Sequence, residues 1–170
     1  MTDAVGWLNG LDRDAAEATL TRCCGSTAWS QTLAGRLPVA DLAALHAAAD
    51  QAFDALPSEA WLEAFACHPR IGDLESLRMK FAGNREWSAG EQAGAAAADD
   101  ATLTRLAEGN DAYLARFGWI FLVCATGKSA AEMLELLEAR LGNEPEAEFR
   151  IACGEQRKIT HLRIDKMSAP

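Results

Sequence analysis

No apolar stretch in this 170-residue sequence approaches the roughly 20 residues that a membrane helix needs. Alternating β-branched residues with tight turns, the usual signal of strands, are also missing. Basic residues are few: 16 Lys and Arg against 25 Asp and Glu give a formal net charge of -9. Phosphate binding needs clustered positive charge, so this balance argues against nucleic acid as the main partner. These absences leave a globular helical protein with neither a membrane nor a nucleic acid as partner.

A disulfide framework is not indicated either. The cysteines number five, an odd count, and they follow no repeating spacing: Cys23, Cys24, Cys67, Cys124 and Cys153. We expect buried, reduced thiols. The first residues carry neither the basic region nor the apolar run of a signal peptide, and the last three are not a peroxisomal address. The expected location is the cytoplasm.

Metal and nucleotide motifs are missing as well. The three histidines, His46, His68 and His161, are widely separated, and no H-x-x-x-H, H-E-x-x-H or C-x-x-C occurs. Neither a phosphate loop nor a dinucleotide fingerprint is present. Cys67 adjoins His68, but adjacent side chains usually point apart, so a thiol–imidazole dyad is not expected. We therefore expect no metal.

Apolar residues at three- and four-residue spacing, with breakers between them, predict one compact all-α domain over residues 1–170. Asp12 is predicted to cap a first helix that Gly25 terminates, and Ser58 to cap a helix that reaches residue 66. The other predicted helices cover residues 27–36, 39–56, 74–81, 88–107, 110–117, 130–141 and 145–166. The apolar run 119–125 fits a buried strand or a buried helix equally well.

The segment 67–73 carries the most chemical information. Pro69 disfavours the α conformation at His68, so this histidine should stand at a helix end and project from a loop. An imidazole there can titrate near neutral pH and act as a general acid or base. A histidine at a helix C-terminus can equally serve only the helix dipole.

Two further side chains admit a functional and a structural interpretation. Ser88 and Glu91 match a capping box that opens a helix, yet Gly90 is a poor helix residue and Gln92 adds a second polar group. Arg163 is either a surface residue paired with Asp165 or Glu155, or a bidentate partner for a carboxylate.

The run 119–125 is more typical of core than of a site. Gly118 before it and Gly127 after it would nevertheless allow its backbone to line a pocket and to bond a polar ligand.

These segments together resemble the 2-oxo-4-hydroxy-4-carboxy-5-ureidoimidazoline (OHCU) decarboxylases of purine degradation. The resemblance covers about residues 65–165 in the family's order and spacing. It is carried by His68-Pro69-Arg70-Ile71-Gly72-Asp73; Ser88, Glu91 and Gln92; Asn110, Tyr113, Phe117 and Gly118; Phe121-Leu122-Val123-Cys124-Ala125 with Gly127; Arg140, Leu141, Asn143 and Glu146; and Ile159, Leu162 and Arg163.

The resemblance implies a homodimer that decarboxylates a small ureide without a cofactor. It implies that His68 is the catalytic acid or base, with Glu91 and Arg163 as catalytic partners. The implied substrate-binding residues are Pro69, Ser88, Ala89, Gly90, Glu91, Gln92, Phe121, Leu122, Val123, Cys124, Ala125 and Arg163. Two other interpretations stay open at this point: a hydrolase or deaminating enzyme acting on a ureide, and a helical interaction module.

Overall fold

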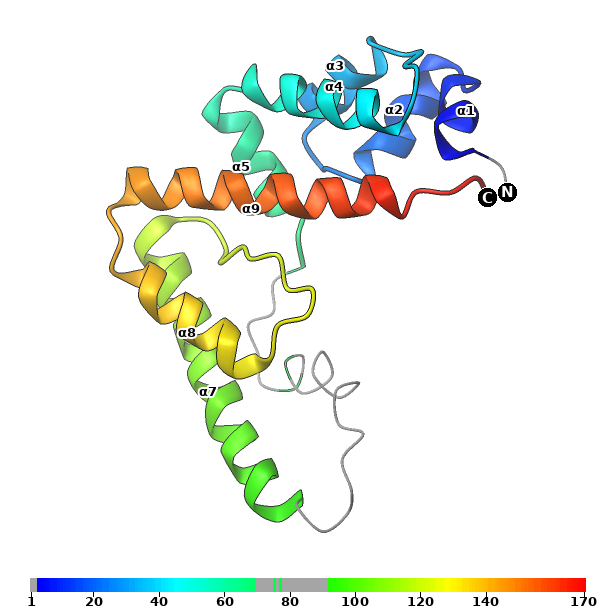
Figure 1. Cartoon of the computed structure of the whole chain (residues 1–170). Helices are drawn as coiled ribbons and strands as arrows, with labels where there is room; N and C mark the ends of the chain where they lie inside the picture. The colour runs from blue at the N-terminus through cyan, green and yellow to red at the C-terminus, as the bar shows by residue number, and fades with distance from the viewer. Residues whose placement is uncertain (1–2, 70–74, 76, 78–91) are drawn as a thin grey trace. The chain divides into compact units, whose positions relative to one another are not determined.

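The computed structural model describes residues 3–69, 75, 77 and 92–170 (Figure 1). Within these residues the secondary structure is helical and includes no strand, which confirms the predicted all-α class. None of the helices found there combines the length and the apolar character needed to cross a bilayer. The helices are α1 (Ala4–Asn9), α2 (Arg13–Thr21), α3 (Thr27–Ala34), α4 (Leu42–Asp54), α5 (Ser58–Ala66), α7 (Gln92–Phe117), α8 (Ala130–Leu141) and α9 (Pro145–Asp165).

The chain divides into two compact units. The first comprises Met1–His68 together with Cys153–Pro170, and the second is Pro69–Ala152. Helix α9 therefore contributes its beginning to the second unit and its remainder to the first.

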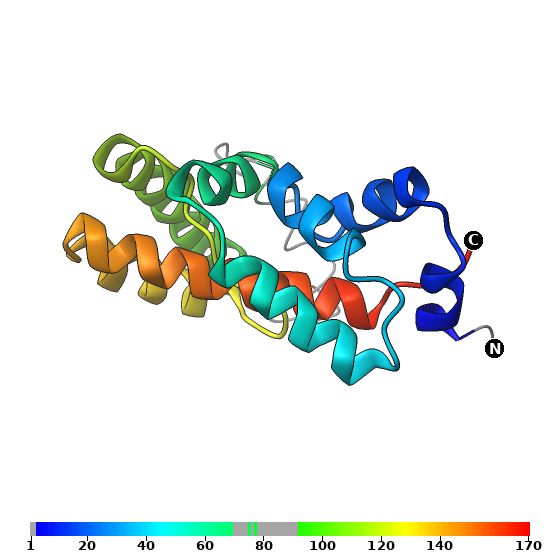
Figure 2. The same cartoon turned by 90° about the horizontal axis from the view of Figure 1, so that it is seen from above.

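In the first unit, α3 packs against α2, α4 and α5. Its fully buried Trp29 lies 5.2 Å from the ring of Phe53, and Phe53 stacks on Trp61 at 4.9 Å between ring centroids. Burial of these large rings supplies much of the apolar area that stabilises the unit. Seen from above, α4 and α9 run alongside each other (Figure 2).

Aspartate and serine side chains cap the starts of α2, α3 and α4, as Asp3 does for α1. Asp12, Ser26 and Asp41 each accept a backbone N–H of the first turn of α2, α3 and α4. The predicted cap at Asp12 is thus confirmed, whereas α4 begins at its own cap rather than at residue 39. Ser58 is not a cap but the first residue of α5, because Pro57 takes the N-cap position without a side-chain bond.

The first unit differs from the expectations in two other ways. Helix α1 was not expected, since six residues are too few for a periodic apolar signal. Gly25 does not terminate α2, because the helix ends at Thr21 with Arg22 as its cap.

In the second unit, α7 is one continuous helix and packs against α8. The sequence predicted a break near Gly109, and this prediction is wrong. A Cβ at Gly109 would lie 2.6 Å from Cδ2 of the buried Leu137 on α8. The glycine thus permits close approach of two helices and does not end one.

A buried ion pair lies at the centre of the polar contacts of this unit. Arg140 and Glu148 have side chains 8% and 0% exposed, and a guanidinium nitrogen lies 2.5 Å from Oε1 of Glu148. The Tyr113 hydroxyl and the Asn143 amide also donate to this carboxylate, at 2.6 and 2.9 Å. Both carboxylate oxygens are therefore satisfied, as a buried charge requires. Glu146, named in the resemblance, is instead an exposed partner of Arg150.

The ion pair yields a stability prediction. Glu148→Ala leaves the Arg140 charge buried without its carboxylate, so we expect a loss of about 3–5 kcal/mol in the free energy of unfolding. Glu146→Ala is the matched control, since its side chain is 82% exposed, and it should leave this free energy almost unchanged. Urea denaturation followed by circular dichroism measures both. Equal losses in the two variants would contradict the assignment of Glu148 as the structural acid.

Candidate functional site

His68 stands at the C-terminal end of α5, as the sequence predicted. The backbone N–H of Cys67 bonds the carbonyl of Ala64, that of His68 bonds Phe65, and the exposed Pro69 follows. The proline has no N–H with which to continue the ladder, so the helix ends there. This ending leaves the half-buried His68 ring free to bond outside its own helix.

The partner of His68 is Gln156 on α9. Nε2 of the ring lies 2.7 Å from Oε1 of Gln156, whose side chain is completely buried. The Gln156 amide nitrogen donates to Thr160 Oγ1 at 3.0 Å, and the Thr160 hydroxyl donates to the backbone oxygen of Gln156 at 2.9 Å. The sequence did not single out Gln156 or Thr160. Their four-residue spacing with Ile164 could have indicated that all three residues lie on the buried side of α9.

Arg163 lies in the same unit and acts electrostatically on His68. Its guanidinium donates to the carbonyl of Cys23 at 3.3 Å. Of the two acids named as its alternative partners, Asp165 accepts from His46 and Glu155 pairs with Lys158. The structure thus brings His68 and Arg163 into one electrostatic neighbourhood.

The pKa of His68 is lowered from its ordinary value of 6.5. Burial is the largest cause, because the charged ring loses solvation. The hydrogen bond to Gln156 acts in the opposite direction, and the positive charge of Arg163 lowers the pKa further. The ring is consequently neutral at neutral pH and able to accept a proton.

A tight contact supports the end of α5. A Cβ added to Gly25 would lie 2.4 Å from Sγ and 2.5 Å from Cβ of Cys67. The Cys67 thiol itself points to the Gly25 carbonyl at 3.7 Å. Gly25 is therefore the residue that allows the chain after α2 to approach the corner preceding His68.

The thiols differ in exposure. Cys67 is exposed, so the expectation of buried cysteines is wrong for this residue. Burial raises the pKa of Cys23, and raises the pKa of Cys24 and of Cys153 to about 11. These three thiols stay protonated at neutral pH and are poor nucleophiles.

The segment 121–125 lies in the second unit and is neither strand nor helix, so both alternatives for it were wrong. Gly118 and Gly127 bracket it at φ values of 84° and 75°, a conformation that favours glycine. The backbone oxygens of Leu122 and Cys124 accept from Arg140 at 2.6 Å and from Lys128 at 2.8 Å. The Arg140 guanidinium also lies 4.7 Å from the ring centroid of Phe121. Side chains thus supply hydrogen bonds to two carbonyls of this partly buried, irregular segment.

Several predicted site residues lie outside the described part of the chain: Ser88, Ala89, Gly90 and Glu91. The predicted capping box of Ser88 and Glu91 lies outside it too. Gln92 is the first residue of α7. Of the predicted helix 74–81, the structure describes Glu75 and Leu77, both helical.

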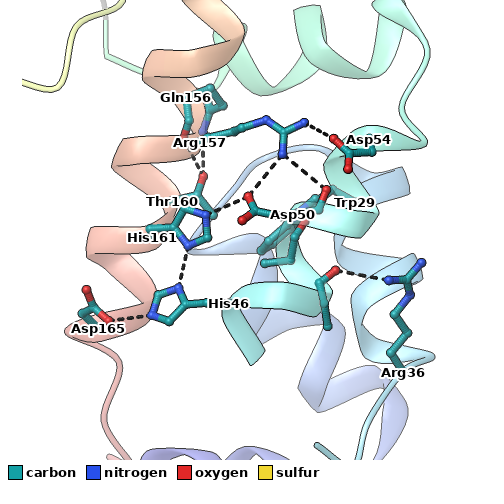
Figure 3. Close-up of polar contacts among 12 residues, drawn as sticks. Trp29, Arg36, His46, Asp50, Asp54, Gln156, Arg157, Thr160, His161 and Asp165 are labelled. Atoms are coloured by element: carbon teal, nitrogen blue, oxygen red, sulfur yellow. Dashed lines mark hydrogen bonds and ion pairs between the residues drawn. The ribbon is translucent and has the colours of Figure 1, made fainter. Parts of the chain in front are cut away.

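The other two histidines form a separate polar cluster between α4 and α9 (Figure 3). Nδ1 of His46 lies 2.5 Å from Nδ1 of His161, while their Nε2 atoms donate to Asp165 and Asp50 at 2.7 and 2.8 Å. Burial raises the pKa of Asp50, but hydrogen bonds and charges from His161 and Arg157 outweigh burial and lower it overall. These contacts hold α9 against α4, and no sequence pattern indicated them.

Among the side chains that the structure describes, those of residues 3–69, 75, 77 and 100–170, no group of three or more His, Cys, Asp or Glu is arranged to hold a metal ion.

Comparisons with known proteins connect the chain to one family. A family model described as OHCU decarboxylase matches residues 9–165. The chain is 40% identical over 146 residues to the uric acid degradation bifunctional protein TTL of Arabidopsis thaliana, covering 85% of this chain and 45% of that protein. It is 36% identical over 113 residues to the 2-oxo-4-hydroxy-4-carboxy-5-ureidoimidazoline decarboxylase of Mus musculus, covering 65% of this chain and 62% of that one.

The chain thus spans only part of the length of these two relatives. A solved OHCU decarboxylase, crystallised in the presence of (S)-allantoin, is 34% identical with a TM-score of 0.69, covering 86% of this chain and 94% of that one. A solved (S)-allantoin synthase, 18% identical with a TM-score of 0.72, shares the fold; the match covers 96% of this chain and 53% of that one.

The contact at Gly25 can be tested by adding one methyl group. Gly25→Ala should lower the free energy of unfolding by about 1–3 kcal/mol, because the Cβ of Cys67 cannot move aside without its backbone. Gly154→Ala in α9 is the control: its Cβ would meet nothing within 4 Å, and alanine favours the helix. Chemical denaturation should show a loss for the first variant and a gain for the second. A gain in both would remove Gly25 as a packing requirement.

The lowered pKa of His68 predicts how stability changes with pH. Below pH 6.5 the unfolded chain binds a proton at this position before the folded chain does. The contribution of His68 to stability is therefore complete above pH 6.5 and declines as the pH falls toward the folded pKa. The difference in unfolding free energy between the native sequence and His68→Gln should shrink over that range. A difference that grows on acidification would show that the fold favours the charged ring.

Proposed function

Because this chain belongs to the OHCU decarboxylase family, we propose that it converts 2-oxo-4-hydroxy-4-carboxy-5-ureidoimidazoline to (S)-allantoin and CO₂ in urate degradation. The family match over residues 9–165 supports this activity. The observation that carries the proposal is the half-buried His68 imidazole, held by Gln156 and placed in the field of Arg163. A neutral ring beside a fixed cation suits a reaction that moves one proton near an anionic group.

The protein has three roles in the proposed reaction. Loss of CO₂ leaves an electron pair, and in this substrate the neighbouring ring imine accepts it, so no cofactor is required to act as the electron sink. The protein holds the leaving carboxylate, stabilises charge on the ring, and delivers a proton to one face of the ureido-bearing carbon. Delivery of the proton to one face determines the handedness of the product.

His68 is proposed as the group that transfers the proton. Its lowered pKa leaves the ring neutral at neutral pH, so it can take a proton from the substrate and deliver one to the ureido-bearing carbon. Arg163 is proposed to orient the anionic head of the substrate by paired hydrogen bonds. The residue is exposed, and its guanidinium has further N–H groups besides the one that donates to the Cys23 carbonyl. Both side chains belong to the first unit.

The remaining roles follow from the family resemblance. Glu91 and Gln92 are proposed to bond the hydroxyl or ureido N–H groups, together with the nearby Ser88, Ala89 and Gly90. Pro69 and the segment 121–125 are proposed to line the ring. A homodimer in the cytoplasm and a metal-free reaction complete the proposal.

Removing the His68 imidazole tests the proposed role. His68→Ala should reduce formation of (S)-allantoin by about two decades or more, since general acid–base help is typically worth ~10²–10⁴ in rate. The assay uses freshly generated substrate and follows the product by circular dichroism. His46→Ala is the control histidine, from the polar cluster on α4, and should keep the rate at a temperature where it is folded. Near-native turnover by His68→Ala would remove His68 from the mechanism.

The same assay separates the proposed activity from hydrolysis or deamination of a ureide. Decarboxylation releases CO₂ and no ammonia. Ammonia formed in step with substrate loss would overturn the proposed function.

A further inference from the structure

The buried side of α9 in the first unit carries two polar residues where apolar ones are usual. Gln156, Thr160 and Ile164 follow one another at four-residue spacing and are all buried. Burial of an amide and a hydroxyl costs free energy unless each group finds a hydrogen-bond partner. Here the partners are each other, the α9 backbone and the His68 ring (Figure 3 labels Gln156 and Thr160).

The bonds of Thr160 fix which way the Gln156 amide faces. The hydroxyl proton of Thr160 goes to the backbone oxygen of Gln156, so its oxygen is left to accept from the amide nitrogen. The amide oxygen therefore faces His68. An amide oxygen can only accept, so Nε2 of His68 must carry the proton of that 2.7 Å bond.

A neutral imidazole has one N–H, and its position decides which nitrogen is basic. With Nε2 occupied by the bond to Gln156, the lone pair of the neutral ring lies on Nδ1. Burial and the positive charge of Arg163 both lower the pKa of His68, which keeps the ring in this neutral form at neutral pH.

We propose that Gln156 is a positioning residue that holds His68 in the Nε2–H tautomer and so makes Nδ1 the nitrogen that exchanges the substrate proton. The catalytic half of this inference rests on the proposed function, whereas the tautomer does not. Gln156 does not touch the substrate in this account; it acts through His68, and Thr160 sets its orientation.

The tautomer can be read directly by NMR. With histidine labelled by ¹⁵N, long-range ¹H–¹⁵N correlations distinguish Nε2–H from Nδ1–H rings, and the His68 signals are identified by their loss in His68→Gln. Recorded at pH 8, above the ordinary histidine value of 6.5, the native protein should show the Nε2–H pattern. Gln156→Leu fills similar space without an acceptor and should give a mixture of tautomers or a change to Nδ1–H.

Gln51→Leu provides the matched control. Gln51 is an exposed residue of α4, and its amide oxygen accepts a hydrogen bond from Arg36 at 2.6 Å instead of one from His68. Its variant should leave the His68 pattern unchanged. An Nδ1–H pattern in the native protein, or an undisturbed Nε2–H pattern in a folded Gln156→Leu, would overturn the positioning role.

Kinetics supply a second readout that a purely structural residue would not change. Gln156→Glu places a carboxylate on Nε2, which favours the imidazolium, and should move the acidic limb of the kcat/KM profile upward by about one pH unit or more. Gln156→Leu should lower kcat by about three- to tenfold, as expected for one lost hydrogen bond, with KM nearly unchanged. An unmoved pH profile in an active Gln156→Glu would count against the proposal.

The two proposals fail in distinguishable ways. If the native protein shows the Nε2–H pattern and Gln156→Leu disturbs it, the positioning role stands even where no OHCU is consumed, and only the proposed function fails. If OHCU is consumed but the Gln156 variants change neither tautomer nor pH profile, the proposed function stands and the positioning role is overturned.

Discussion

The hydrogen bond between His68 and Gln156 is the interaction on which the proposed chemistry of the first unit depends. It joins residues 88 positions apart in the chain and connects the end of α5 to the buried side of α9. Because the amide is completely buried, its oxygen needs this partner, and the ring gains an orientation that no neighbouring residue on α5 provides. One bond therefore satisfies a buried polar group and fixes an ionisable one. Removing either side chain would cost free energy, because the other side chain would lose its hydrogen-bond partner.

Local features of the sequence were sufficient to predict most of the helices. Asp12 at the start of α2 caps as expected, since capping depends on residues within one turn. Pro69 likewise predicts the end of α5. Gly109 shows the limit of local reasoning: glycine weakens an isolated helix, but here Leu137 on another helix requires its small size. The contact between the two helices, and not the local propensity of glycine, explains why glycine occurs within the continuous helix α7.

The candidate site was predicted in part. The sequence identified His68 and Arg163, and the structure places both in the first unit. Gln156 was missed because a single glutamine within a helical pattern carries no signal until its burial is known. Glu148 was missed in favour of Glu146 for a similar reason: two positions along a helix separate a buried face from an exposed one. The catalytic roles of His68, Arg163 and Glu91 stay predictions.

The division of α9 between the two units has a consequence for synthesis on the ribosome. Residues 1–68 emerge first, yet the part of α9 that completes their unit follows the whole of the second unit. Nascent α5 therefore presents its histidine long before Gln156 exists to accept from it. The imidazole gains this partner only after α9 has been synthesised, so a ribosome stalled before α9 would hold a chain whose His68 still lacks its hydrogen bond to Gln156.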